Sequence, residues 1–360
     1  MSRGLIHFGL RLLLTVTILL AVCGCWDNKD INHRALPVVM GLDHQNGAYK
    51  VYLLIPHTTQ RRTDVRIVTK EGSTINQVVD KIAKDLEVDV DLLHLKVLVF
   101  HRAVAEAGMK DSISSFMRAR DISPKTIVAI SDDNLETLFQ KLKTSSTSGG
   151  MEIYNFFQKH AGWSPNVAQT RVWEIYRSLD SFTRDVAVPL IKAGQTTPIE
   201  STGSAVIKNG MMVGRITPDE TLLFNSFNGL AAQGKIEVMD RASVMILTEN
   251  LTHSSSFNDG KPVLNSRLTL KVTILETKGS PTEAMIKQDT ESLLTDRFGR
   301  MLRKIQSEEA DILGLGQLFR TKIPRDRLTS WRTDYYPTMK VNFQVNTIIQ
   351  NEGLLKMKNK

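Results

Sequence analysis

Cysteine is nearly absent from this chain of 360 residues, which contains only Cys23 and Cys25. Beyond residue 25 the sequence therefore offers no disulfide, no thiol nucleophile and no cysteine ligand for a metal. Exported proteins often rely on disulfides, so two closely spaced cysteines near the start of the chain need another explanation.

Long apolar runs are also scarce. Residues 12–22 (LLLTVTILLAV) form a largely apolar run behind a start that carries Arg3 and Arg11. This run has the length of a signal-peptide core and is too short to span a bilayer, which takes about 20 residues. No later stretch approaches the roughly 18 apolar residues of a membrane span. A lipid group is therefore expected to be the only anchor.

The sequence VCGC, which ends at Cys25, indicates a lipoprotein cleavage site. A small residue before a cysteine lets a peptidase cut there once the thiol carries a diacylglycerol, and Gly24 meets this requirement, with aliphatic Val22 two positions before it. Cys23 fits less well, because Val22 would occupy the small-residue position. We expect residues 1–24 to be a signal peptide and Cys25 to carry an S-diacylglycerol and an N-acyl group, which together anchor firmly. A secreted protein with incidental cysteines and an uncleaved anchor remain open alternatives.

No strong excess of either charge sign is present. The chain has 46 Lys and Arg against 38 Asp and Glu, and its formal charge of +8 falls to +6 when Arg3 and Arg11 leave with the signal peptide. This balance suits a body near anionic lipid headgroups, where each nearby cation contributes roughly 1 kcal/mol. Trp26 lies either at the membrane interface or packed on the first domain. Nucleic-acid binding is not expected, because Lys and Arg are scattered along the chain and export would remove the opportunity.

No motif for catalysis, a metal or a cofactor is complete. Four alternating acids resemble a calcium loop but lack the glycine and glutamate that such a loop needs. Gly314 and Gly316 begin a dinucleotide fingerprint whose next glycine is replaced by Phe319, so helix capping explains them better. The histidines form no HExxH or HxH pair, no GxSxG elbow exists, and residues 254–256 (SSS) are predicted to lie in a polar loop without a base. We therefore predict no catalytic, cofactor-binding or metal-binding residue, and paired carboxylates far apart in sequence are the one route to an enzyme left open. The alternating acids are Asp85, Glu87, Asp89 and Asp91.

The first half of the chain alternates predicted strands and helices. Residues 36–43 and 48–56 are β-rich runs around His44-Gln45-Asn46-Gly47, and Asn-Gly between such runs predicts a hairpin. Ser73-Thr74 is predicted to cap a helix with an apolar stripe. This alternation indicates α/β or α+β packing. Further strands are predicted at 94–100, 126–131 and 186–191, and further helices at 112–118, 135–142, 151–159 and 171–179.

The second half predicts a mostly antiparallel sheet with one long helix. Asn209-Gly210 lies between two β runs and predicts a hairpin. Thr217 and Pro218, followed by two acids, predict the N-cap and first turn of a helix. Strands are predicted at 242–251, 263–277 and 339–349, a long helix at 282–307 and a short one at 309–319.

Two polar breaks, at residues 144–150 and 194–203, suggest domain boundaries. We predict a multi-domain α+β or α/β protein with mixed and antiparallel sheets and packed helices, whose C-terminal domain places a long helix on an antiparallel sheet. The expected units are the signal peptide 1–24, an N-terminal α/β domain 25–143, a middle region 144–200, and a C-terminal α+β domain 201–360. The middle region is either a small second domain or an extension of the first.

Several separated segments follow the pattern of one family. Residues 24–32 (GCWDNKDIN) contain the GCWD sequence, polar residues and Ile-Asn with which its members begin, and Gly41-Leu42-Asp43 resembles the Gly-Ile-Asp that ends an early strand. In this pattern the chain resembles the Ger(x)C family of spore-germination lipoproteins over nearly its full mature length. It departs from the family at His101-Arg102, where Gly or Ser and Glu are frequent, and in its last strand, where Lys and Arg are frequent. The other similar segments are 94–100, 203–214, 311–316 and 341–354.

The resemblance implies the C subunit of a nutrient germinant receptor. Such a subunit is lipid-anchored on the outer face of the spore's inner membrane and works with an A subunit and an integral membrane B subunit. Its fold is three α/β-type domains without known catalytic residues. Whether it binds a small molecule directly is not implied. The alternative is a solute-binding lipoprotein of an uptake system, which shares the anchor and the size. A cell-wall hydrolase is disfavoured by the missing catalytic residues.

A docking protein concentrates its binding energy in a few central residues, often aromatic residues and Arg. Residues 311–336 gather both kinds and are therefore one candidate surface for the partner subunits. The competing interpretation is that these rings pack under the last strand. The side chains concerned are Phe319, Trp331, Tyr335, Tyr336, Arg320, Arg325 and Arg332.

Overall fold

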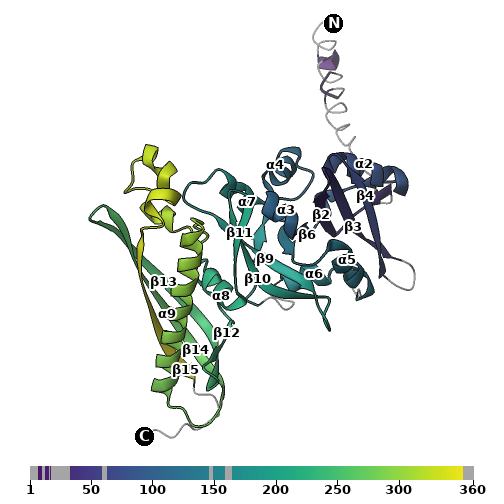
Figure 1. Ribbon diagram of the computed structural model, residues 1–360. Coiled ribbons are helices and arrows are strands. Elements are labelled where there is room, and N and C mark those ends of the chain that lie inside the picture. The colour runs from purple at the N-terminus through teal and green to yellow at the C-terminus, as the bar shows by residue number, and fades with distance from the viewer. Residues whose placement is uncertain are drawn as a thin grey trace.

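The computed structural model describes residues 7–9, 13–15, 17, 33–58, 63–145, 149–158 and 164–351. The predicted lipidation site Cys25 lies outside the described residues, as do Trp26 and most of the predicted signal peptide. The molecule is elongated, with a large mixed sheet toward its N-terminal end and a smaller sheet with a long helix toward its C-terminal end (Figure 1). Within the described ranges, no helix is long and apolar enough to cross a membrane.

The N-terminal sheet has nine strands, of which β2, β6, β7 and β9 run parallel at its centre. The central strands are buried on both faces because they are almost wholly apolar, as at Val97 and Phe100, which are fully inaccessible. On one side β3 and β4 continue the sheet in antiparallel fashion, and on the other side β10 and β11 do so. The short β8 pairs with β7, and β1 pairs with β5 apart from this sheet. The bounds are β1 Arg34–Ala35, β2 Val39–Gln45, β3 Ala48–Thr58, β4 Thr63–Gly72, β5 Asp89–Val90, β6 Val97–His101, β7 Ile127–Ser131, β8 Thr170–Arg171, β9 Val186–Ala193, β10 Ile199–Lys208 and β11 Met211–Ile216.

Helices cover both faces of this sheet. One apolar cluster combines one sheet face with α2, α3, α4 and α7, and a second combines the other face with α5 and α6. The apolar stripe predicted behind Ser73-Thr74 is confirmed, because Ile75, Val78 and Ile82 of α2 are buried and Thr74 accepts a hydrogen bond from the Gln77 amide. The bounds are α2 Ile75–Leu86, η2 Leu92–His94, α3 Arg102–Ala107, α4 Lys110–Ala119, α5 Leu135–Thr144, α6 Glu152–Phe156 and α7 Val172–Leu179.

Two predicted hairpins are confirmed by backbone geometry. Asn46 and Gly47 between β2 and β3 have φ of 52° and 78°, and Asn209 and Gly210 between β10 and β11 have φ of 52° and 81°. Positive φ at both central residues defines the turn whose twist matches that of the flanking strands, and Asn-Gly adopts it readily.

The C-terminal sheet has the order β12-β13-β14-β15, and the apolar side of α9 packs on one of its faces. The helix α8 precedes this sheet in the chain. Its predicted start is confirmed, because the Thr217 side chain accepts a hydrogen bond from the Glu220 amide and the Glu220 side chain accepts one from the Thr217 amide. The long predicted helix is confirmed as α9 with Thr282 at its N-cap. The bounds are α8 Pro218–Phe227, β12 Lys235–Val238, β13 Ala242–Asn258, β14 Lys261–Thr277, α9 Glu283–Ser307, η3 Leu315–Phe319, η4 Arg325–Ser330, η5 Trp331–Tyr335 and β15 Lys340–Asn351.

The predicted mostly antiparallel sheet is confirmed, and its last strand β15 pairs parallel to β14 because α9 carries the chain back along the sheet before β15 begins. Two local predictions in this half were wrong. Residues 254–256 do not form a loop, because β13 continues to a tight turn at Asp259–Gly260. The short helix at 309–319 is reduced to the 3₁₀ turn η3, since Gly314 at φ 65° stands directly before it.

The predicted α+β fold class with several units is confirmed. The predicted division between residues 200 and 201 lies inside β10, which pairs with β9 and β11, so the N-terminal sheet continues to Ile216. One apolar cluster also combines Ala187 and Val206 of that sheet with α8, α9 and the C-terminal sheet. The two sheets therefore share one core where they meet. The division of the chain into domains stays a prediction.

Candidate functional site

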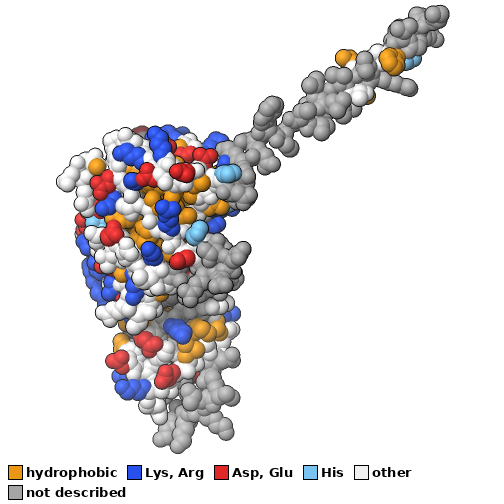
Figure 2. Space-filling model, turned by 90° about the vertical axis from the view of Figure 1, so that its right-hand side faces the viewer, with side chains coloured by type: hydrophobic (Ala, Val, Ile, Leu, Met, Phe, Trp, Pro, Cys, Tyr) orange, Lys and Arg blue, Asp and Glu red, His pale blue; other side chains and the backbone are white. Residues whose placement is uncertain are grey.

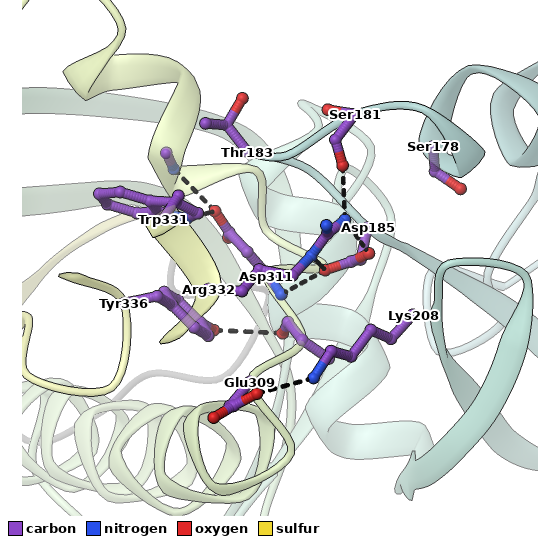
Figure 3. A network of polar contacts seen from close by, with 12 residues as sticks. Ser178, Ser181, Thr183, Asp185, Lys208, Glu309, Asp311, Trp331, Arg332 and Tyr336 are labelled. Atoms are coloured by element: carbon purple, nitrogen blue, oxygen red, sulfur yellow. Dashed lines mark hydrogen bonds and ion pairs between the residues drawn. The ribbon is translucent and has the colours of Figure 1, made fainter. Parts of the chain in front are cut away.

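A buried ion pair joins the N-terminal sheet to the segment between α9 and β15. Asp185 directly precedes β9, and Arg332 lies in η5. Arg332 Nε donates to Asp185 Oδ2 at 3.0 Å and Nη2 donates to Oδ1 at 2.7 Å (Figure 3). The side chain of Asp185 is 0% exposed and that of Arg332 is 10% exposed. The bidentate contact allows one relative orientation of the two segments.

Asp311 completes this network from the loop after α9. Its amide donates to Asp185 Oδ2 at 2.8 Å, and its carboxyl accepts from the Leu315 and Gly316 amides at 2.8 and 2.7 Å. Trp331 Nε1 donates to the same carboxyl at 2.9 Å. Gly316 is required here, since a Cβ at this position would lie 2.6 Å from the Trp331 ring. We call Asp185, Asp311, Trp331 and Arg332 the junction network.

Burial dominates the electrostatics of the junction network. It raises the pKa of the Asp311 carboxyl to about 7, against the opposing effect of the hydrogen bonds from Gly316 and Leu315. Burial also raises the pKa of Asp185, although Arg332 acts in the opposite direction. The pKa of Tyr336 rises for the same reason, and its hydroxyl donates to the Ala310 carbonyl at 3.3 Å.

Three further ion pairs join α9 and the loop after it to the preceding part of the chain. Lys208 at the end of β10 contacts Glu309 at 2.9 Å, Lys304 of α9 contacts Glu220 of α8 at 2.8 Å, and Arg297 of α9 contacts Asp219 at 2.8 Å. They connect α9 and its following loop to β10 and α8, which are the elements that link the two sheets.

The junction network has the chemistry of a structural joint. All four carboxyl oxygens of Asp185 and Asp311 accept at least one hydrogen bond, and the two residues are only 1% and 0% exposed. Among the described residues, no group of three or more His, Cys, Asp or Glu is placed to hold a metal ion. The arrangement can hold two parts of the protein in register, and it offers no nucleophile.

The candidate docking surface at residues 311–336 is largely interior. Phe319, Trp331 and Tyr336 are fully buried, and Arg332 is 8% exposed. These side chains therefore lie inside the protein, and the competing interpretation, which placed the rings under the last strand, stays a prediction. Their place is the junction between the sheets, with Phe319 also against Phe257 at the end of β13. Arg320 and Arg325 remain exposed.

The other residues considered from sequence do not converge on one site. Asp91 caps η2 and pairs with Arg34 at 2.6 Å, Asp85 pairs with Lys70 at 2.5 Å, and Glu87 ends α2 with φ 57°. Ser255 of β13 donates to the Leu318 carbonyl and receives a hydrogen bond from Lys322. Each of these residues has a local structural role.

A second polar cluster, which the sequence did not reveal, lies where the parallel strands end. His101 Nδ1 lies 3.0 Å from the buried Asp43 Oδ1, which joins the ends of β6 and β2. Asp132, directly after β7, accepts from Arg215 at 2.7 Å and from Thr202 at 2.6 Å. One feature of the sequence could have indicated this cluster: polar residues directly follow the buried parallel strands, and the carboxyl ends of parallel strands lie at the same edge of a sheet. His101-Arg102, the departure from the family pattern, lies in this cluster.

Charge is mixed over the visible surface. Figure 2 shows Lys and Arg interspersed with Asp and Glu over the face that it presents. That face carries no continuous basic patch of the kind that nucleic-acid binding requires.

Comparisons with known proteins agree along the chain. Residues 27–193 match the family model described as Spore germination protein N-terminal domain, and residues 202–353 match the one described as Spore germination B3/GerAC like, C-terminal. The chain is similar to Spore germination protein A3 of Bacillus subtilis (strain 168), with 20% identity over 96% of this chain and 98% of the relative. It is also similar to Spore germination protein KC of the same organism, with 18% identity over 96% of each chain.

A solved structure shares the fold. The crystal structure of the GerBC protein matches with a TM-score of 0.58 and 15% identity, over 87% of this chain and 97% of that one. At this identity the likeness concerns the arrangement of helices and strands alone.

Proposed function

Because this chain belongs to the GerAC-like, or Ger(x)C, family of spore germination proteins, we propose that it is the lipid-anchored C subunit of a nutrient germinant receptor. The observation that carries the proposal is the ordered match of both family models from residue 27 to residue 353. The match starts two residues after Cys25, so the family body would begin directly at the anchor.

In this proposal Cys25 carries an S-diacylglycerol and an N-acyl group, and the body lies on the outer face of the spore's inner membrane. Two signals of this kind, a diacyl group and an amide-linked chain, give stable attachment without a membrane-spanning helix. The partners are the A and B membrane subunits of the receptor. The subunit contributes by docking, without chemistry or a cofactor of its own.

The joint between the sheets supports a rigid docking body. A solute-binding lipoprotein closes two lobes around a hinge, and its lobes must separate to admit the solute. Here Asp185 and Arg332 form a buried pair across the joint, and Ala187 and Val206 share a core with α8 and α9. This packing favours the receptor subunit over the solute-binding alternative.

The experiment that tests the proposal is co-purification from spores. A tagged chain should bring down both the A and the B subunit from detergent-solubilised inner membranes, and deleting its gene should abolish germination with at least one nutrient. If neither subunit is recovered and the deletion strain germinates normally with every nutrient tried, the receptor assignment is wrong.

Cys25→Ala should leave the signal peptide uncut and the protein without lipid, because no other residue can accept the diacylglycerol in the required position. Cys23→Ala, the matched control, should be labelled and processed like the wild type. Metabolic labelling with a fatty-acid analogue measures both. Label retained by Cys25→Ala would contradict the assignment of the anchor.

A further inference from the structure

The tip of the β13–β14 hairpin and the segment after η3 form one surface at an end of the molecule (Figure 1). Ser255 Oγ donates to the Leu318 carbonyl at 2.9 Å, and Lys322 Nζ donates to Ser255 Oγ at 2.8 Å. The Phe257 ring packs edge-on against Phe319, with 5.7 Å between the ring centroids. These contacts hold the two segments together. We call this surface the basic tip, and it comprises residues 256–262 and 320–327 with Lys340, which pairs with Val263 of β14.

Exposed positive charge is concentrated in the basic tip. Its six cations against Asp259 and Asp326 leave a net charge of +4, which the exposed Asp334 nearby lowers to +3. In the described part of the chain none of the six forms an ion pair, and the partners of Arg320 and Lys322 are neutral groups. The charge of the basic tip is therefore available to an anionic partner. The six cations, all exposed, are Lys261, Arg320, Lys322, Arg325, Arg327 and Lys340.

The opposite end of the same sheet carries no such excess. Three acids and two cations line a shallow hollow there, and one of the cations, Arg241, pairs with Asp289 at 3.2 Å. An anionic surface would therefore attract the C-terminal half of the protein by the basic tip and not by its other end. The charged residues of the hollow are Glu237, Asp240, Arg241, Glu276 and Lys278.

An exposed aromatic ring lies among these cations. Phe257 is 36% exposed at the end of β13, where the half-buried Tyr335 packs on it with 6.1 Å between the ring centroids. The headgroup layer of a membrane accommodates this combination well. Aromatic rings lie at the boundary between headgroups and acyl chains, and long basic side chains extend their charges to the phosphates. The composition of the basic tip thus favours an anionic lipid surface as its partner.

The basic tip lies on the same side of the molecule as the start of the folded body. That body begins with β1, which pairs with β5, and β5 contacts α2. The helix α2 and the segment η3–η5 both lie along the upper side of Figure 1, toward its two ends, so that one plane can touch both. The chain advances eight residues from Cys25 to His33, which span at most roughly 30 Å. A membrane that holds lipid on Cys25 is therefore close to α2 and can reach the basic tip.

We propose that the basic tip docks on the anionic headgroups of the membrane that holds the lipid on Cys25. Phe257 enters the headgroup layer, and the six cations contact lipid phosphates around it. Each cation near such a surface strengthens binding roughly fivefold, and salt screens the effect. The proposal rests on the lipid anchor proposed above. It adds a second contact, which fixes the side of the protein that faces the membrane.

The test places one fluorophore on the full-length protein, held by its lipid in vesicles. The mature chain has no other free thiol when Cys25 is acylated, so the variant Asn258→Cys is labelled at the basic tip alone. Its quenching by spin-labelled lipid headgroups should be at least about threefold stronger than that of the matched control Glu276→Cys, which lies roughly 50 Å away at the other end of β14. This difference should appear in vesicles that contain phosphatidylglycerol, and it should shrink in neutral phosphatidylcholine vesicles and at high salt.

The double variant Arg325→Glu/Arg327→Glu should reduce quenching at the basic tip to the level of the control position, because two cations at the contact become acids. Both side chains are exposed and make no hydrogen bond within the described ranges, so the fold should be unaffected. Arg300→Glu/Arg303→Glu on the exposed side of α9 changes the net charge equally and should be quenched within about twofold of the wild type. The salt dependence of the wild type tests the same contact without a substitution.

Equal quenching at the two positions, quenching that does not require phosphatidylglycerol, or a double variant that is quenched like the wild type would overturn the proposal. A basic tip that is protected only after the A and B subunits are added would assign this surface to a protein partner and would also overturn it. Flotation with the vesicles measures the anchor separately. Protein that floats with an unquenched tip leaves the lipid anchor intact and contradicts only this contact, whereas protein that does not float overturns the anchor and the contact together.

Discussion

Replacing Arg332 by methionine should lower the free energy of unfolding by about 3–5 kcal/mol. The reason is the carboxylate of Asp185, which is 0% exposed and would lose both hydrogen bonds from the guanidinium. A buried charge left without its partner costs far more than the pair itself contributes. Methionine retains much of the apolar stem of the arginine side chain. The loss of stability therefore measures the effect of the unpaired Asp185 charge and not that of a cavity left in the core. Urea-induced unfolding of the purified protein measures it.

Two further variants make this result specific. Arg327→Met removes an exposed arginine from the neighbouring η4 and should change stability by no more than about 0.5 kcal/mol. The double variant Arg332→Met/Asp185→Asn removes the stranded charge while keeping an acceptor, and should recover about 1–3 kcal/mol. An Arg332→Met protein as stable as Arg327→Met would show that the pair does not hold the joint.

The stability of the wild-type protein should fall as the pH rises from about 4 to about 7, and Asp311→Asn should flatten that dependence. Burial raises the pKa of Asp311 from 3.8 in an ordinary aspartate to about 7. Between these values the folded state keeps a proton that the unfolded chain has lost, so each rise in pH favours unfolding. The stability that this bound proton contributes is fully present below pH 3.8 and is lost as the pH rises through about 7. Its full size is roughly 4 kcal/mol.

Asp311→Asn should also lower stability at pH 5 by about 1–3 kcal/mol, because an amide cannot accept from all three N–H donors that point at this side chain. Asp334→Asn, at an exposed position in the same segment, should leave both the stability and its pH dependence unchanged. Unfolding free energies from pH 4 to pH 8 compare the three proteins. A wild-type slope that persists in Asp311→Asn would assign the titration to another group, such as Asp185.

Local sequence signals determined a large share of the elements. The Asn-Gly pairs at 46–47 and 209–210 set two hairpins, because few other residues accept positive φ twice in succession. Thr217 with Glu220, and Thr282, set the starts of α8 and α9, because a cap acts on amides only two or three residues away. The fold class followed from these elements, and the VCGC and GCWD sequences led to the expected anchor and the family. Each of these signals acts over a few residues, so a short stretch of sequence is enough to recognise it.

The tertiary structure alone decided how distant segments meet. Parallel pairing of β15, the addition of β10 and β11 to the first sheet, and the burial of Trp331 depend on contacts that no local pattern encodes. Asp185 and Arg332 are 147 residues apart in sequence, and each alone resembles an ordinary surface charge. They become a structural joint because folding removes both from water in one place, where an ion must be paired.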